Sequence, residues 1–299
     1  MKNQIKTLVL LGAMSALILG LGALVAPQAL GLFAVLALAM NLGAYFFSDR
    51  IVLRMHGASE VTTDEAPELH AIVAELAVAA GIPKPRVCVM PEEQPNAFAT
   101  GRSPDKGVVA VTEGLLRLLD RRELRGVIAH ELAHIKNRDI LVSSIAAAAA
   151  TMITYIAQTL GFGAMFGGGS RDEESESGSG ITGLVAIFVA PLAATLIQFG
   201  ISRSREFLAD ETGARICGDP EALARALAKL EDAAGVVPVE TADATASLFI
   251  VNPFGGARTM SRWFSTHPDT RERVERLMQL ARSVRPGSVV SMKPGLLRA

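Results

Sequence analysis

Long runs without a charged residue alternate with charged segments along this chain. The first two runs, residues 7–26 and 29–47, are separated by the helix breaker Pro27, and two more cover 141–167 and 181–201. About 20 apolar residues in a helix cross the roughly 30 Å hydrocarbon core of a bilayer, which is close to the length of each run. The pattern therefore predicts four membrane helices, paired as two hairpins.

Each predicted hairpin has an alternative. For residues 7–26 it is a cleaved signal peptide, because Lys2 and Lys6 precede them, although the apolar part of a signal peptide is typically about 7–15 residues. For 141–167 and 181–201 it is a buried hairpin of a soluble domain, because these runs contain Ser, Thr and Gln. Small and hydroxyl residues are also common where membrane helices pack together, so we retain the prediction of four spans.

Basic residues flank both predicted hairpins, and the connection within each hairpin is poor in them. Basic residues close to membrane spans remain on the cytoplasmic side. We therefore expect a multi-pass protein of the plasma (inner) membrane whose charged segments lie on the cytoplasmic face. The flanking residues are Lys2, Lys6, Arg50 and Arg54 for the first hairpin, and Lys136, Arg138, Arg203 and Arg205 for the second.

Shorter periodic patterns in the charged segments predict a soluble domain of the α+β class. Three runs bounded by turn residues, 86–90, 95–100 and 107–112, are typical of the strands of a small sheet. Asp120 and Glu123 have the spacing of a capping box. Amphipathic patterns predict helices over 64–81, 114–140, 202–216, 219–233 and 269–282.

The second predicted hairpin divides the soluble domain in sequence, because charged segments lie on both sides of it. Helices outnumber strands in both parts, so we expect a mainly helical domain. The expected order is a transmembrane hairpin over 1–48, the first part of the soluble domain over 49–140, a second hairpin over 141–201, the second part over 202–282, and a flexible tail over 283–299.

The amino-acid composition excludes several classes of protein. The 299 residues are 50% hydrophobic and 20% charged, with a net charge of −1 and a mean hydropathy of +0.34. This apolar content excludes a disordered chain, and the balanced charge gives no electrostatic reason to expect a nucleic acid as partner. Two cysteines, Cys88 and Cys217, are too few for a disulfide scaffold and fit a reducing compartment.

A metal-binding pattern occupies the predicted helix over 114–140. His130 and His134 stand four residues apart in the sequence His-Glu-Leu-Ala-His, so they share one face of a helix and both imidazoles can reach one metal ion. Glu131 is offset by one residue, which places its carboxylate beside that ion as a general base. The alternative is a helix that carries two surface histidines.

A third ligand is expected, because catalytic zinc usually has three protein ligands and an open position for water. The best candidate is Glu206, at the start of the helix predicted directly after the last span. Asp210 lies four residues further on the same face and is suited to accept a hydrogen bond from a ligating histidine. The alternative is that these two carboxylates only solvate a helix face.

These motifs together resemble the HtpX family of membrane-bound zinc metalloproteases, which are related to the CAAX prenyl proteases and share the glutamate-zincin plan. The resemblance rests on HELAHIKNRD at 130–139 and SREFLAD at 204–210, separated by a hydrophobic hairpin. NAFATG at 96–101 and STHP at 265–268 extend it over most of the chain. The family usually has a second proline where Asp269 stands, which leaves the shape of that turn in doubt.

The resemblance implies a zinc-dependent endopeptidase with one Zn²⁺ per chain. His130, His134 and Glu206 would hold the zinc, and Glu131 would activate water. The resemblance further implies that the strand with Asn96, Ala97, Phe98 and Ala99 is an edge strand that pairs with an extended substrate. It also suggests that His267 stabilises the oxyanion of the reaction, although a surface or helix-capping histidine is an alternative.

The position of the motif favours a site at the membrane surface. Lys136 and Arg138 follow it directly, and charges are costly at the hydrocarbon centre, which argues against an intramembrane protease. The resemblance suggests quality control of damaged or misfolded membrane proteins, with unfolded or membrane-protein substrates, the bilayer as surroundings and no nucleic acid. The alternatives are a dedicated processing protease for one substrate, or a non-catalytic membrane scaffold with bound zinc.

Overall fold

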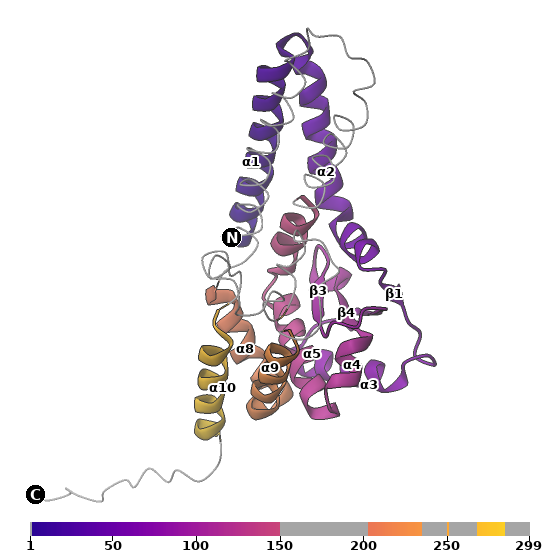
Figure 1. Ribbon diagram of the computed structural model, residues 1–299, viewed down its shortest axis with the longest axis vertical. Coiled ribbons are helices and arrows are strands. Elements are labelled where there is room, and N and C mark those ends of the chain that lie inside the picture. The colour runs from indigo at the N-terminus through magenta and orange to yellow at the C-terminus, as the bar shows by residue number, and fades with distance from the viewer. Residues whose placement is uncertain (1, 150–202, 235–249, 251–267, 285–299) are drawn as a thin grey trace, which may run out of the picture.

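A helical hairpin extends from one end of the computed structural model, which describes residues 2–149, 203–234, 250 and 268–284 (Figure 1). Helix α1 covers Lys2–Val25 and helix α2 covers Leu30–Met55, joined by the short helix η1, Pro27–Ala29. Pro27 ends the first helix and starts the turn, as its missing N–H and fixed φ dictate. Helices therefore cover both runs of the first predicted hairpin.

The second helix of this hairpin is longer than predicted. Instead of ending at residue 47, α2 continues through Asp49, Arg50 and Arg54 to Met55. Within the described residues, the segment Pro27–Met55 is the one helix long and apolar enough to cross a membrane, and the apolar part of α1, Ile5–Gly20, is shorter. Four spans are thus not established.

The described part of the second predicted hairpin is the helix Ile140–Ala149, and its other residues lie outside the described part of the chain. Ile145, Ala146 and Ala149 pack against Leu10 and Met14 of the first hairpin. Between α1 and α2, the Asn41 amide donates to Ser15 Oγ at 2.6 Å. Small residues and interhelical hydrogen bonds are typical of helix packing in membranes. Small residues occur in the contact of helix Ile140–Ala149 with α1, and the hydrogen bond occurs in the contact of α1 with α2.

A four-stranded mixed sheet lies beside the lower end of α2, in the order β1-β2-β4-β3 (Figure 1). The three predicted strands are present: β2 over Arg86–Met90, β3 over Ala97–Thr100 and β4 over Val108–Thr112. β4 is parallel to β2 and antiparallel to β3. The two-residue strand β1, Ser59–Glu60, was not predicted, because two residues carry no periodic pattern.

Helices cover the other side of this sheet. The predicted helix over 114–140 is wrong as a single element, because the chain forms α4, Glu113–Leu118, and then starts again as α5, Arg121–Lys136. Asp120 caps the second helix, and together with Glu123 it completes a capping box. The remaining helices are α3 over Pro67–Ala80, α8 over Arg203–Cys217, α9 over Pro220–Ala234 and α10 over Thr270–Val284.

The sheet lies between the end of the α1–α2 hairpin and the helices α3, α5 and α9. One face, with Cys88, Met90 and Phe98, packs on Val52 and Leu53 of α2. Successive residues of a strand point to opposite faces of the sheet. The opposite face, which includes Val109 and Val111 of β4, packs in the core that contains α3, α5 and α9. Because both faces are buried, the sheet couples α5 to the end of α2.

Candidate active site

Helix α5 forms the floor of the site and is buried along most of its length. His130 and Glu131 are 1% and 4% exposed, although both are polar. Helix α8 packs closely on it at Gly213, where an added Cβ would lie 2.8 Å from both the Cα and the N of His130. This close approach of two backbones brings the first turns of α8 over the histidines.

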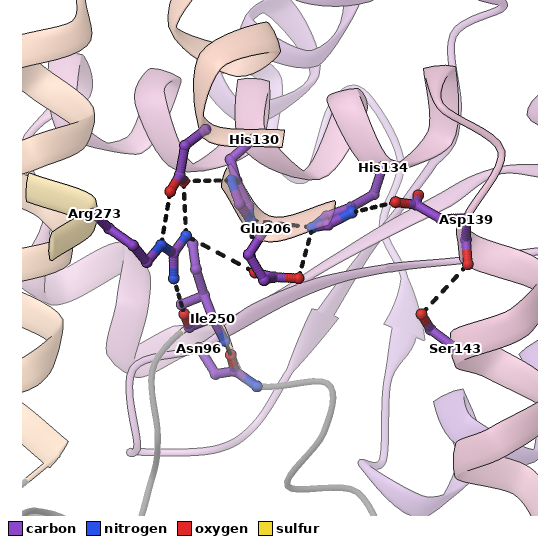
Figure 2. A network of polar contacts seen from close by, with 9 residues as sticks. Asn96, His130, His134, Asp139, Ser143, Glu206, Ile250 and Arg273 are labelled. Carbon is purple, nitrogen blue, oxygen red and sulfur yellow. Dashed lines mark hydrogen bonds and ion pairs between the residues drawn. The ribbon is translucent and has the colours of Figure 1, made fainter. Parts of the chain in front are cut away.

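Three candidate ligand atoms converge between these two helices. Nε2 of His130 and Nε2 of His134 are 3.1 Å apart, and each lies 3.7 Å from an oxygen of Glu206. Figure 2 shows both imidazoles and the Glu206 carboxylate turned toward one point. The ligand atoms lie within 4.8 Å of one another.

These distances suit a tetrahedral metal ion. Zinc bonds of roughly 2.0–2.2 Å in tetrahedral geometry would separate neighbouring ligand atoms by roughly 3.3–3.6 Å. The two Nε2 atoms are 3.1 Å apart, and each imidazole lies 3.7 Å from a different oxygen of Glu206. Two imidazoles and one carboxylate are also the ligand set of several catalytic zinc sites. The residues present therefore fit a zinc ion with one position open.

Each histidine has its own carboxylate behind it. Nδ1 of His130 lies 3.0 Å from Oδ1 of Asp210, and Nδ1 of His134 lies 3.2 Å from Oδ2 of Asp139. A carboxylate at Nδ1 fixes the tautomer that leaves Nε2 free to bind a metal. Asp210 thus stands where the sequence placed it, whereas Asp139 is an additional partner that the sequence analysis did not assign.

The charges of the cluster favour a bound cation. Burial by itself would lower the pKa of His134, but the carboxylates of Asp139 and Glu206 outweigh burial and raise it to about 10. Burial lowers the pKa of His130 despite its contact with Asp210. The carboxylates around the two imidazoles therefore favour positive charge between them, which a divalent cation would supply.

Glu131 lies beside the ligands without joining them. Burial, with a smaller contribution from the neighbouring Glu206 and against the opposing effect of His134, raises the pKa of this carboxyl group to about 8. The backbone of Ala99 in β3 forms a hydrogen bond to the Glu131 carboxylate. A carboxyl group with a pKa near the working pH is suited to exchange protons with a substrate.

A buried arginine from α10 supports the site. Arg273 is fully buried and donates from Nε and Nη2 to the two oxygens of Asp210, both at 2.8 Å. Its Nη1 donates to the carbonyl oxygen of Ile250 at 2.7 Å, and Nη2 lies 4.0 Å from Glu206 (Figure 2). Burial disfavours the guanidinium, but Asp210 outweighs burial and raises the pKa of Arg273 above its ordinary value. The arginine therefore remains charged.

Arg273 was assigned no role from the sequence beyond membership of the predicted helix over 269–282. The sequence did contain a sign that Arg273 is buried. Arg273 is spaced four and eight residues from Leu277 and Ala281, so it lies on the same helix face as these two buried residues. A charged residue at an apolar position of an amphipathic helix requires a buried partner. That partner, Asp210, lies 63 residues earlier in the chain, so the sequence pattern did not identify it.

The predicted substrate strand lies at an edge of the described sheet, since β3 pairs with β4 alone there. The N–H of Thr112 donates to the carbonyl oxygen of Asn96, and the N–H of Asn96 donates to Oγ1 of Thr112, both at 2.9 Å. In an antiparallel pair every second residue directs its backbone groups toward the partner strand, so the backbone groups of Phe98 also point toward β4. The backbone groups of Ala97 and Ala99 therefore point away from β4, and Ala99 faces Glu131, although all four residues of β3 are buried. The Asn96 side chain is turned elsewhere, because its Oδ1 accepts from the backbone N–H of Ile250 at 3.2 Å.

The predicted oxyanion residue, His267, lies outside the described residues, as does the predicted tail over 283–299 beyond Val284. Its role stays a prediction. The other predicted residues are brought together: the two histidines and Glu131 from α5, Glu206 and Asp210 from α8, and the edge strand β3.

A small mixed sheet beside a helix with two histidines, completed by a glutamate from a second helix, defines a metallopeptidase of the glutamate-zincin class. The profile of peptidase family M48 matches residues 63–281. A protease HtpX homolog of Syntrophobacter fumaroxidans is 52% identical over 94% of this chain and 100% of its own length, and one of Pyrococcus abyssi is 53% identical over 93% and 96%. The chain belongs to peptidase family M48 and, within it, to the HtpX proteases.

A solved structure is also similar. The crystal structure of S. mikatae Ste24p has a TM-score of 0.47 and 18% identity over 92% of this chain and 65% of that chain. That likeness is too distant to bear on individual residues. The close relatives make this chain a membrane zinc metalloprotease.

Proposed function

We propose that the chain is an endopeptidase in which His130, His134 and Glu206 hold one zinc ion per chain. The observation that carries this proposal is the convergence of their three ligand atoms within 4.8 Å, from two helices held together at Gly213. Bound zinc supplies Lewis acidity, which polarises a peptide carbonyl and makes water a better acid. Asp210 and Asp139 hold the two imidazoles with Nε2 toward the metal.

Glu131 is the general base of the proposed reaction. Its carboxylate takes a proton from the attacking water and later transfers a proton to the leaving amine. Two observations support this role: the side chain is buried beside the ligand cluster, and its pKa is raised to about 8. A carboxyl group at its ordinary pKa would be a weaker base.

The edge of β3 that points away from β4 is the proposed binding site for the substrate backbone. An extended peptide that pairs with Ala97 and Ala99 would lie along the edge that faces Glu131. Backbone pairing gives affinity with little side-chain selectivity, which is consistent with a broad range of unfolded substrates. His267 is proposed to stabilise the oxyanion of the transition state.

The packing of the sheet supports the proposed membrane placement. Val52 and Leu53 of α2 contact one face of the sheet, and α5 lies against the other, so the active site is separated from the end of α2 by one sheet layer. Packed layers are about 10 Å apart. The catalytic site is therefore proposed to lie on the cytoplasmic face of the inner membrane, close to the bilayer.

A membrane-impermeant maleimide tests this orientation. Glu60→Cys introduces an exposed thiol in β1, in a chain whose native cysteines have been replaced. The proposal expects labelling in inverted membrane vesicles and none in right-side-out vesicles. The reverse pattern would place the catalytic domain on the outer face.

The proposed biological role is quality control of damaged or misfolded membrane proteins. A site that binds substrate backbone next to the bilayer suits segments of membrane proteins that have lost their fold. A dedicated processing protease would instead cut one sequence and leave unfolded proteins intact. A scaffold would bind zinc without needing Glu131.

Cleavage of casein by detergent-purified protein separates these possibilities. The protein is purified under chelator to limit self-cleavage, and zinc is then restored to the wild type and to Glu131→Gln. We expect zinc-dependent cleavage by the wild type, a loss of about 10²-fold or more in the variant, and one zinc per chain in both. A wild type that binds zinc but leaves casein intact would favour the processing protease, or the scaffold if Glu131→Gln also retained full function in cells.

A further inference from the structure

A cavity lies where α2 changes from apolar to charged. Its volume is about 510 Å³, and it is lined by the end of the apolar run of α2, by the start of β2 and by the connection between β3 and β4. The apolar run of α2 ends at Phe47, and the first charged residue after it is Asp49. In a membrane, the cavity is therefore at the level of the lipid headgroups.

Positive charge predominates in this cavity. Five basic residues line it against two acidic residues, Asp49 and Asp105. Arg86 is already paired, because it lies 3.1 Å from Glu60 and 3.7 Å from Asp49. Within the described part of the chain, Arg50, Arg102 and Lys106 form no ion pair with a carboxylate, and all three are exposed. The cavity therefore has cations to offer to an anion from outside.

Two exposed aromatic rings adjoin these cations. Phe46 and Phe47 are 47% and 49% exposed. The Arg102 guanidinium lies 5.8 Å from the centre of the Phe46 ring, and that of Arg50 lies 5.6 Å from the centre of the Phe47 ring. Cation–π contacts of this kind help to hold a guanidinium in place beside apolar surface. The site thus combines an apolar wall with fixed positive charge.

We propose that this cavity binds the phosphate headgroup of an anionic glycerophospholipid. The phosphate would accept hydrogen bonds from Arg50, Arg102 and Lys106, because guanidinium groups match phosphate oxygens in a fork geometry. The acyl chains would lie against Phe46 and Phe47. Free phosphate shares the headgroup chemistry but makes no use of the apolar wall, so the lipid is the occupant that uses both parts of the site. This inference rests on the membrane placement in the proposed function.

Native mass spectrometry of the full chain in detergent tests this proposal. The Glu131→Gln background prevents self-cleavage, and the probes are phosphatidylglycerol, phosphatidylcholine and inorganic phosphate. The pocket variant is Arg50→Gln/Arg102→Gln/Lys106→Gln. The control is Arg215→Gln/Arg271→Gln/Arg282→Gln, which removes the same charge from exposed positions of α8 and α10.

We expect the parent to retain phosphatidylglycerol on the order of 10- to 100-fold better than phosphatidylcholine. The pocket variant should lose this preference and the control should keep it. Equal preference in the pocket variant and the control would overturn the proposal. Displacement of the lipid by millimolar inorganic phosphate would overturn it in favour of a free-anion site.

Two further measurements keep the result interpretable. Thermal unfolding of the pocket variant checks that it is folded, and the single variant Arg102→Gln, expected to show an intermediate preference, replaces it if it is not. Lipid retention requires no proteolysis, so it is measured separately from cleavage. If the wild type fails to cleave casein while the Glu131→Gln protein prefers phosphatidylglycerol, only the proposed function is refuted. If the wild type cleaves casein while the Glu131→Gln protein shows no lipid preference, only the lipid site is refuted.

Discussion

Arg273 and Asp210 form a bidentate ion pair in which both hydrogen bonds measure 2.8 Å and the guanidinium is fully buried. Asp210 in turn lies 3.0 Å from Nδ1 of His130. The last described helix, α10, is therefore linked through one arginine to the residue that orients a candidate zinc ligand. Asp210 is also kept ionised, because burial would raise its pKa but Arg273 outweighs burial and lowers it to about 2.

Arg273→Met should destabilise the protein and weaken zinc binding. Removing one partner of a buried ion pair leaves an uncompensated charge, which typically costs about 3–5 kcal/mol of unfolding free energy. Denaturant unfolding and a zinc titration measure the two effects. Arg282→Gln, which removes an exposed arginine from the same helix, is the control and should change neither. Unchanged zinc affinity in a folded Arg273→Met protein would show that the arginine does not support the site.

Asp139→Asn and Asp210→Asn should each lower zinc affinity by about 10- to 100-fold, because either change weakens the orientation of one histidine. The variants are compared by competition with a chromophoric chelator. Asp232→Asn, at an exposed position of α9, should keep the wild-type affinity. If Asp139→Asn also behaved like the wild type, the contact of 3.2 Å with His134 would have no role in metal binding.

Gly213→Ala should separate α5 from α8, because the new Cβ would lie 2.8 Å from backbone atoms of His130. We expect lower stability, as overpacking typically costs about 1–3 kcal/mol, together with weaker zinc binding. Gly43→Ala in α2 meets no atom within 4 Å and serves as the matched control. Thermal unfolding and zinc content distinguish them, and equal values for the two variants would contradict the close packing at Gly213.

Cys88 should resist alkylation in the folded protein. Burial raises the pKa of this thiol from 9.0 to about 11, so it is a neutral thiol at neutral pH. Because the pKa is higher in the folded state, the thiol contributes its full share to the free energy of unfolding below pH 9. This contribution is lost as the pH rises toward about 11. Mass spectrometry after maleimide treatment at pH 7 should find Cys88 unmodified, and modified once the protein is unfolded. Rapid labelling of the native protein would contradict the burial of β2.

Local patterns explain why much of the fold followed from sequence. The helices over α3, α8, α9 and α10 and the strands β2, β3 and β4 lie within a few residues of their predicted bounds, because periodicity and caps act over one or two turns. The predicted helix over 114–140 was wrong although its capping box was recognised. Asp120 satisfies the first N–H groups of a new helix, so the same signal that marks a helix start also marks the break after α4.

The sequence by itself determined the metal-binding pattern of this protein, because His130, Glu131 and His134 are placed by the pitch of a single helix. The spacing of Glu206 and Asp210 likewise follows from one helix face. Only the tertiary structure decided that these two helices meet, that Asp139 lies behind His134 and that Arg273 is buried against Asp210. The physical reason is that these contacts depend on how whole elements pack, and no local pattern specifies which buried charge will meet which partner 63 residues away.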